Sequence, residues 1–170
     1  MRFALSAVIL LVAASMQMAG NTPKESKPNA GFDKLKALEG NWKGKDENGN
    51  PVGVTYKLVS AGSAIMETLD MADNKEAMVT MYHVNNERLM MTHYCSLGNQ
   101  PRMRADRAPK AANTLAFSYI DATNLASPDD DHMAKLVFTF KDADHFSQAW
   151  TLHSKGKGEH PSLFEFERMK

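Results

Sequence analysis

The sequence predicts an all-β protein, an antiparallel up-and-down barrel of about nine or ten strands with a short N-terminal helix. Three observations support this prediction. Alternating apolar and polar residues recur in short segments between residue 40 and the C-terminus, polar turns join these segments, and little helical periodicity follows Gly40. An open meander of this length would have two unpaired edges, so closure into a barrel is favoured.

Residues 1–20 are typical of an export signal. Arg2 gives a positive start, and the apolar run after it is too short to span a bilayer comfortably. Small residues fit cleavage after Ser15 or near Ala19 or Gly20, with an uncleaved membrane anchor as the alternative. We therefore expect a signal peptide, a flexible leader and a barrel domain at residues 1–20, 21–30 and 31–170. The mature protein would be periplasmic or secreted, without a transmembrane span.

The segment 31–40 predicts the short helix, because Phe32, Leu35 and Leu38 have helical spacing and Gly40 can end it. In the next segment, Trp42 and Gly44 share one strand face. The Asn-Gly pair within residues 47–51 then predicts a tight hairpin. The remaining segments expected as strands, one of them short, are 52–60, 63–71, 77–84, 88–98, 100–106, 114–125, 134–142, 145–155 and 162–170.

The last segment suggests what covers Trp42. Phe164, Phe166 and Arg168 share one face of this strand, and two glutamates share the other. In a closed meander the first and last strands are neighbours. We therefore expect Arg168 to stack on the Trp42 indole and to donate to backbone carbonyls at one end of the barrel.

This arrangement resembles the calycin superfamily, the lipocalin and fatty-acid-binding-protein-like β-barrels. The resemblance consists of a short helix, the Gly-x-Trp of residues 40–42 and the terminal Arg168, and as a pattern it extends from about Phe32 to the C-terminus. The middle segments look similar to a group of uncharacterised bacterial exported proteins. The resemblance implies structural roles for Trp42 and Arg168; the alternative is that Arg168 binds a ligand carboxylate.

The sequence departs from lipocalins in having no disulfide pair and no obvious long C-terminal helix. The nitric-oxide-binding haem barrels called nitrobindins share the general build, but no histidine here matches their haem ligand. No cofactor is therefore predicted, and haem stays an open alternative.

The composition of the chain limits the classes of binding partner that we expect. The formal net charge is zero with acids and bases interspersed, which argues against nucleic acid as a partner. Cys95 is the single cysteine and cannot form an internal disulfide. Abundant methionine suits an adaptable apolar interior.

The most polar strand segment, 88–98 with its continuation, suggests a ligand site. Either face of this strand could point inward, because both faces mix apolar and polar groups. The candidate ligand-binding residues are Tyr82, His83, His93, Tyr94, Cys95, Arg102, Arg104 and His132.

Several alternatives stay open for these residues. His93 and Cys95 could form a thiolate–imidazole pair, but a buried inert thiol is favoured. His83 could lie across from the His93 region and join a metal site, although no compact ligand spacing supports one, and none is predicted. Arg102 and Arg104 bind an anion if they point inward; otherwise they form a solvated pair beside Asp106. The Asp129–Asp131 run is favoured as a solvated turn over a cation site.

Three functions compete. The first is a binding protein whose barrel interior holds a small apolar or amphipathic molecule. The second is an enzyme that uses a His/Tyr/Cys/Arg cluster in the same cavity. The third is a filled barrel that acts as an envelope interaction protein. Binding is favoured over catalysis, and no catalytic residue is assigned.

Overall fold

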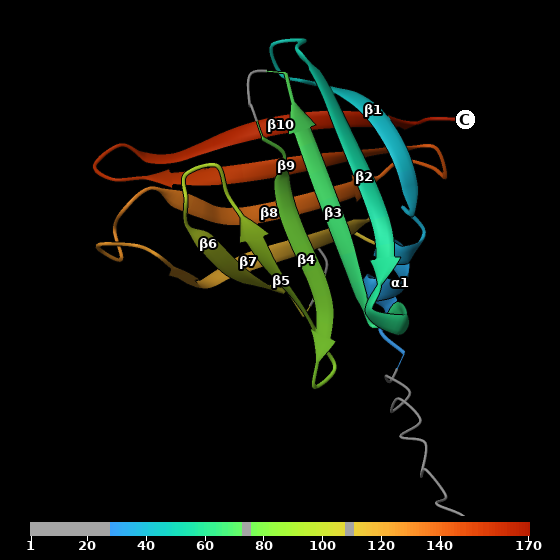
Figure 1. The fold of residues 1–170 in the computed structure, drawn as a ribbon, viewed down its shortest axis with the longest axis horizontal. Helices are drawn as coiled ribbons and strands as arrows, with labels where there is room; N and C mark the ends of the chain where they lie inside the picture. The colour runs from blue at the N-terminus through green and yellow to red at the C-terminus, as the bar shows by residue number, and fades with distance from the viewer. Residues whose placement is uncertain (1–27, 73–75, 108–110) are drawn as a thin grey trace, which may run out of the picture.

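The chain forms a closed antiparallel barrel of ten strands in up-and-down order, with one short helix, in a computed structural model that describes residues 28–72, 76–107 and 111–170 (Figure 1). The predicted fold class is confirmed. The predicted signal peptide and most of the leader lie outside the described residues. The elements are α1 (Ala30–Lys36), β1 (Gly40–Asp46), β2 (Pro51–Val59), η1 (Ser60–Gly62), β3 (Ala64–Met71), β4 (Met78–Asn85), β5 (Arg88–Tyr94), β6 (Gln100–Ala105), β7 (Thr114–Thr123), β8 (His132–Phe140), β9 (His145–Ser154) and β10 (Gly158–Arg168).

Closure joins β1 to β10, with Trp42 opposite Arg168 in the antiparallel register. Because Gly44 has no side chain, β1 and β10 can approach each other closely at this position. A Cβ at Gly44 would lie 2.3 Å from the Glu165 carbonyl oxygen and 2.5 Å from the Phe166 ring. A side chain at this position would therefore push the last strand away from the first.

Arg168 caps the barrel at the end where α1 lies. Its guanidinium carbon lies 4.1 Å from the centre of the Trp42 ring. The guanidinium also donates to the carbonyls of Ala37, Glu39 and Ala143 at 2.8 to 3.3 Å. Arg168 thus ties the end of β10 to the segment after α1 and to the loop between β8 and β9.

The helix packs against one end of the barrel, close to the ends of β2 and β3 (Figure 1). The Asn29 side chain caps α1 by accepting from the Phe32 amide at 3.0 Å. Phe32 and Leu35 are buried in the barrel core. The helix ends before the predicted residue 40, but Leu38 still reaches the core and accepts a hydrogen bond from the Trp42 indole at 2.7 Å.

The barrel interior is filled by side chains from every side of the sheet. Tyr82, Phe117, Leu136 and Phe138 have no exposed surface, so they touch no water-sized space. Aromatic rings continue this packing to the closure: Phe146 meets the Trp42 ring edge-on at 4.7 Å between centroids. The core therefore occupies the centre where a lipocalin-like ligand was expected.

Candidate functional site

A polar network lies inside this core, around Glu67. Tyr82 from β4 donates to the Glu67 carboxyl at 2.7 Å, and Gln148 from β9 donates to the same oxygen at 2.9 Å. Gln148 also donates to the Tyr56 hydroxyl at 2.7 Å and accepts from the Trp150 indole at 3.1 Å. Because β9 and β3 are not neighbours in the sheet, the Gln148 bond to Glu67 crosses the barrel interior.

Burial shifts the pKa values of the ionisable groups in this network. Glu67 has no exposed surface, and desolvation raises its pKa above the ordinary 4.5 despite the hydrogen bonds that favour the charged form. Burial, and then the charge that Glu67 would carry, raise the pKa values of Tyr56 and Tyr82 well above 10. The core network is thus made of buried, hydrogen-bonded groups whose charged forms burial disfavours.

His93 extends the network towards the other end of the barrel. Its Nδ1 lies 2.9 Å from the Thr80 hydroxyl, and that hydroxyl lies 3.5 Å from the second Glu67 oxygen. The imidazole packs against Trp150 at 4.6 Å between centroids. Burial lowers the pKa of His93 from 6.5 to about 4, so the ring is neutral near pH 7. Thr80 donates to the Glu67 carboxyl, and the tautomer of the neutral His93 ring sets the direction of the bond between Thr80 and Nδ1.

This packing does not fit a haem at His93. The side chain is 1% exposed, one ring nitrogen bonds Thr80 and one ring face covers Trp150. A haem iron would need a free imidazole nitrogen facing an opening the size of a porphyrin, and the described residues bury the His93 side chain almost completely. Among the described residues, no group of His, Cys, Asp or Glu side chains has metal-binding geometry.

The described part of the chain has a concave site at the α1 end of the barrel, which we call the α1 pocket. It has a volume of about 330 Å³. Its lining comes from α1, the β4–β5 hairpin and the adjacent ends of β6 and β7: Asn29, Ala30, Gly31, Lys34, Glu87, Arg88, Leu89, Ala105, Asp106, Arg107, Thr114, Leu115 and Ala116.

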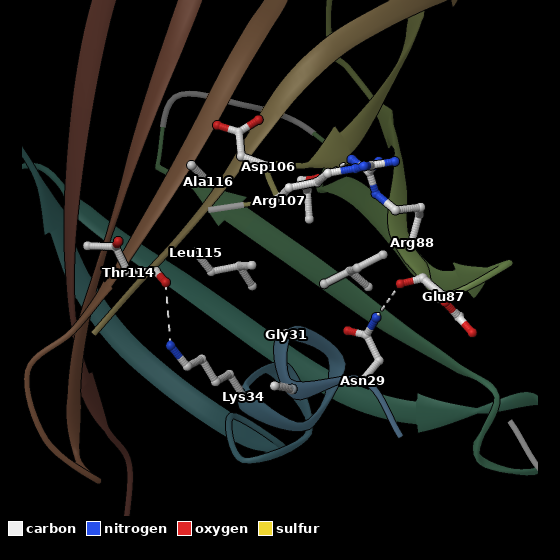
Figure 2. Close-up of a pocket in the computed structure, with 13 residues that line it drawn as sticks. Asn29, Gly31, Lys34, Glu87, Arg88, Asp106, Arg107, Thr114, Leu115 and Ala116 are labelled. Carbon is white, nitrogen blue, oxygen red and sulfur yellow. Dashed lines mark hydrogen bonds between the residues drawn. The ribbon is translucent and has the colours of Figure 1, made fainter. Parts of the chain in front are cut away.

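Figure 2 shows how this pocket is arranged. Leu115 projects into the space between the helix and the strands, facing Gly31. Gly31 belongs to the apolar lining, because a Cβ there would come within 3.0 Å of Leu89 and 3.3 Å of Leu115. Lys34 and Arg88 stand on opposite sides (Figure 2). The pocket therefore combines apolar walls with a charged rim, which contains three cationic and two acidic residues: Lys34, Arg88, Arg107, Glu87 and Asp106.

Hydrogen bonds hold the rim in place. The Asn29 amide donates to the Glu87 carbonyl at 2.9 Å and so ties α1 to the β4–β5 hairpin. Lys34 donates to the Ala112 carbonyl at 2.6 Å. Arg88 donates to the Ala105 carbonyl at 2.9 Å. These bonds neutralise no charge, because their acceptors are backbone carbonyls.

The structure separates the candidate residues predicted from the sequence instead of gathering them into one site. Tyr82 and His93 point into the core network, and Cys95 is buried, where burial raises the pKa of its thiol. The face of β5 left open by the sequence is thereby settled: Leu89, Met91 and His93 point inward, and Tyr94 is exposed. The remaining exposed candidates are His83, Arg102 and Arg104.

Two contacts considered from the sequence differ in the structure. His83 lies opposite Met90 in the β4–β5 pairing, and Thr80 is the residue opposite His93. Arg102 and Arg104 both point outward, which was the favoured alternative, and Arg104 lies in one groove with Asp106, whereas Arg102 pairs with Asp121 at 2.6 Å from Nε to Oδ1. Register explains both differences, because the hairpin turn and the β-bulge in the β6–β7 pairing fix which residues meet.

His132 lies near the end of the barrel opposite α1. Its ring stacks between Tyr119 at 4.3 Å and His153 at 5.0 Å, and its Nδ1 lies 2.6 Å from the Asp130 carbonyl oxygen. The preceding Asp129–Asp131 run forms a turn. There Asp131 accepts from the Lys155 amide at 2.8 Å, which fits the solvated turn expected from the sequence.

Sequence reasoning missed Glu67 and Gln148. A signal for both was present: Glu67 lies in phase between Ile65 and Leu69, and Gln148 between Phe146 and Trp150. A polar residue at an inward position between two large apolar residues needs a buried partner. The residues of the α1 pocket carry no such local signal, because the pocket forms where separate segments converge.

The chain matches no protein-family model and no curated protein sequence. Among solved structures, it is similar to a protein of unknown function from the DUF3598 family of Nostoc punctiforme, with 12% identity and a TM-score of 0.54. That match covers 88% of this chain and 53% of the Nostoc protein, so the chain spans about half the length of that relative. It is also similar to Rv2717c from M. tuberculosis, with 14% identity and a TM-score of 0.53 over 85% of this chain and 100% of the other.

These likenesses establish the fold alone: the neighbours share the antiparallel barrel, which is consistent with the calycin resemblance. A third structure, EF1p2_mFAP2b bound to DFHBI, has 11% identity over 81% of this chain and 98% of the other, and its TM-score of 0.36 carries no argument about this chain. No helix among the described residues is long and apolar enough to cross a membrane.

Proposed function

We propose that this chain is an exported barrel protein that binds a small apolar or amphipathic molecule in the α1 pocket. The observation that carries the proposal is the lining of this pocket, in which apolar side chains such as Leu89 and Leu115 lie beside Lys34 and Arg88. Ligand pockets typically combine an apolar lining with a few polar groups that orient the guest. A volume of about 330 Å³ suits a small ligand.

The proposed place of binding is the mouth of the barrel beside α1, not its centre. The polar groups of the centre satisfy one another, and Glu67 and Gln148 have no exposed surface. A guest at the centre would have to break these bonds and displace close-packed rings. Binding in the α1 pocket requires neither the loss of these hydrogen bonds nor the displacement of core rings.

The proposed location outside the cytoplasm comes from residues 1–20, whose positive start and short apolar run are typical of an export signal. A small exported binding protein with one cysteine would depend on its core for stability. The filled interior supplies such a core.

Native mass spectrometry of the protein purified from its host tests the proposal. We expect a bound small molecule in the wild-type protein and in Ala149→Met, a matched control on β9 outside the pocket. We expect its loss in Ala105→Met, which fills the pocket from its β6 wall. No adduct, together with no thermal shift on addition of amphipathic molecules, would contradict the proposal.

The filled interior also favours a second candidate, the envelope interaction protein, since a barrel without a central guest can act through its outer surface alone. Capture of one partner protein by both the wild type and Ala105→Met, with no small molecule bound to either, would favour this candidate. A catalytic role for His93 gains no support, because its side chain is 1% exposed.

A further inference from the structure

We propose that the molecule bound in the α1 pocket carries a phosphate-type dianion, which Arg88, Arg104 and Arg107 bind where the pocket continues onto the outer surface of β5–β7. This inference rests on the proposed function and deepens it. The dianion site, which we call the arginine groove, is lined by Arg88, Arg104, Asp106, Arg107, Ser118, Tyr119 and Ile120 and has a volume of about 430 Å³.

The arginine groove and the α1 pocket form one continuous surface. Arg88, Asp106 and Arg107 line both. Figure 2 shows Arg88 and Arg107 at the edge of the α1 pocket, away from the helix. An elongated ligand can therefore place an apolar tail against Leu89 and Leu115 and its charged end among the arginines.

The groove has an unbalanced positive charge. It contains three guanidinium groups and one carboxylate, Asp106, which accepts a hydrogen bond from the Ser118 hydroxyl at 2.8 Å. Within the described ranges, no carboxylate lies within ion-pair distance of Arg88, Arg104 or Arg107. Arg102 on the same strand differs, because Asp121 occupies its guanidinium.

The three cations lie close enough to repel one another. Partial burial, then the charges of Arg104 and Arg107, lower the pKa of Arg88. A ligand with two negative charges relieves this repulsion better than a monocarboxylate does. The several oxygens of a phosphate can also accept from more than one guanidinium. The ligand class is therefore an alkyl or acyl phosphate, free or as a lipid headgroup.

Calorimetric titration of the full exported protein with matched probes tests this inference. The probes are n-octyl phosphate, octanoate, n-octanol and inorganic phosphate. We expect n-octyl phosphate to bind at least about tenfold more tightly than octanoate, and salt to weaken this preference. The double variant Arg104→Met/Arg107→Met should lose the preference and keep its affinity for n-octanol. The control Arg102→Met should behave as the wild type.

The outcomes separate the two proposals. Equal affinities for n-octyl phosphate and octanoate, or an unchanged preference in the double variant, would overturn the dianion assignment and leave the pocket intact. Failure of every octyl probe to bind would overturn the proposed function itself. Inorganic phosphate that binds as tightly as n-octyl phosphate would overturn the role of the α1 pocket as the tail site. Binding to vesicles of phosphatidic acid, with no binding to phosphatidylcholine vesicles, would support the assignment and identify the lipid headgroup as the source.

Discussion

At the scale of single residues, the centre of the barrel depends on the protonation of two buried groups with opposite pH responses. Glu67 holds its proton more tightly in the folded protein than in the unfolded chain. His93 holds its proton less tightly in the folded protein. Linkage then predicts that the Glu67 contribution to the free energy of unfolding falls as the pH rises and that the His93 contribution falls as the pH falls. The two contributions oppose each other where their pH ranges overlap.

The first prediction concerns Glu67→Gln. The contribution of Glu67 to the free energy of unfolding should fall as the pH rises from 4.5 through its raised pKa, because the folded state must give up a proton that the unfolded chain has already lost. Glutamine keeps an acceptor for Tyr82 and Gln148 but does not titrate. Urea unfolding at several pH values should show this fall in the difference between the wild type and Glu67→Gln, and not in the difference between the wild type and the exposed control Glu167→Gln. A difference between the wild type and Glu67→Gln that does not change with pH would contradict the assignment.

The second prediction concerns His93→Gln. The contribution of His93 to the free energy of unfolding should fall by about 3 kcal/mol as the pH falls from 6.5 to about 4, because the unfolded chain binds the His93 proton first. The side-chain amide of glutamine can still form a hydrogen bond with Thr80, so the variant should fold and show a smaller acid-dependent loss than the wild type. His83→Gln, an exposed position on the adjacent strand, is the control. An identical loss of unfolding free energy at acid pH in the wild type and in His93→Gln would rule out this role of His93.

At the scale of elements, the close approach of β1 and β10 completes the barrel. Arg168 reinforces it by stacking on Trp42 and by bonding the segment after α1. Both residues were recognisable from the sequence, because a large aromatic on the first strand and an inward arginine on the last need each other in a closed meander.

The third prediction tests this closure with Gly44→Ala. The added methyl group would overlap the Glu165 carbonyl, at 2.3 Å, so the variant should lose about 3 kcal/mol or more of unfolding free energy. Gly53→Ala on β2 is the matched control, since the nearest atom to its added Cβ lies 3.8 Å away. Chemical denaturation of both variants measures the difference. Equal stabilities would mean that β10 can move away from β1 at no cost.

The strand pattern was predictable because alternation along each segment is a local property. The α1 pocket was not, because it combines Gly31, Arg88 and Leu115 from segments far apart in the chain. The expectation of a central ligand had a physical cause as well. Polar residues at inward positions suggested a water-filled cavity. In the structure, Tyr82 and Gln148 both donate to Glu67, and all three side chains are fully buried.

At the scale of the whole molecule, the proposed export makes a fourth prediction. A C-terminally tagged chain expressed in a bacterial host should reach the envelope fraction or the medium with residues up to Ser15, or up to about Gly20, removed. Mass spectrometry of the purified product gives its N-terminus. Leu11→Lys, which breaks the apolar run, should leave the chain uncleaved, whereas Lys24→Gln in the leader should have no effect. A mature product that still begins at Met1 would contradict export by a cleaved signal.

The central claim is that a ligand binds at the mouth of a filled barrel, beside α1. An NMR titration of the ¹⁵N-labelled protein with n-octyl phosphate tests it most directly. We expect the amide signals of Gly31, Arg88 and Leu115 to shift, and the indole signal of Trp150 to stay unchanged. Shifts concentrated on Gln148 and Trp150, with none along α1, would place the ligand at the centre and contradict this account.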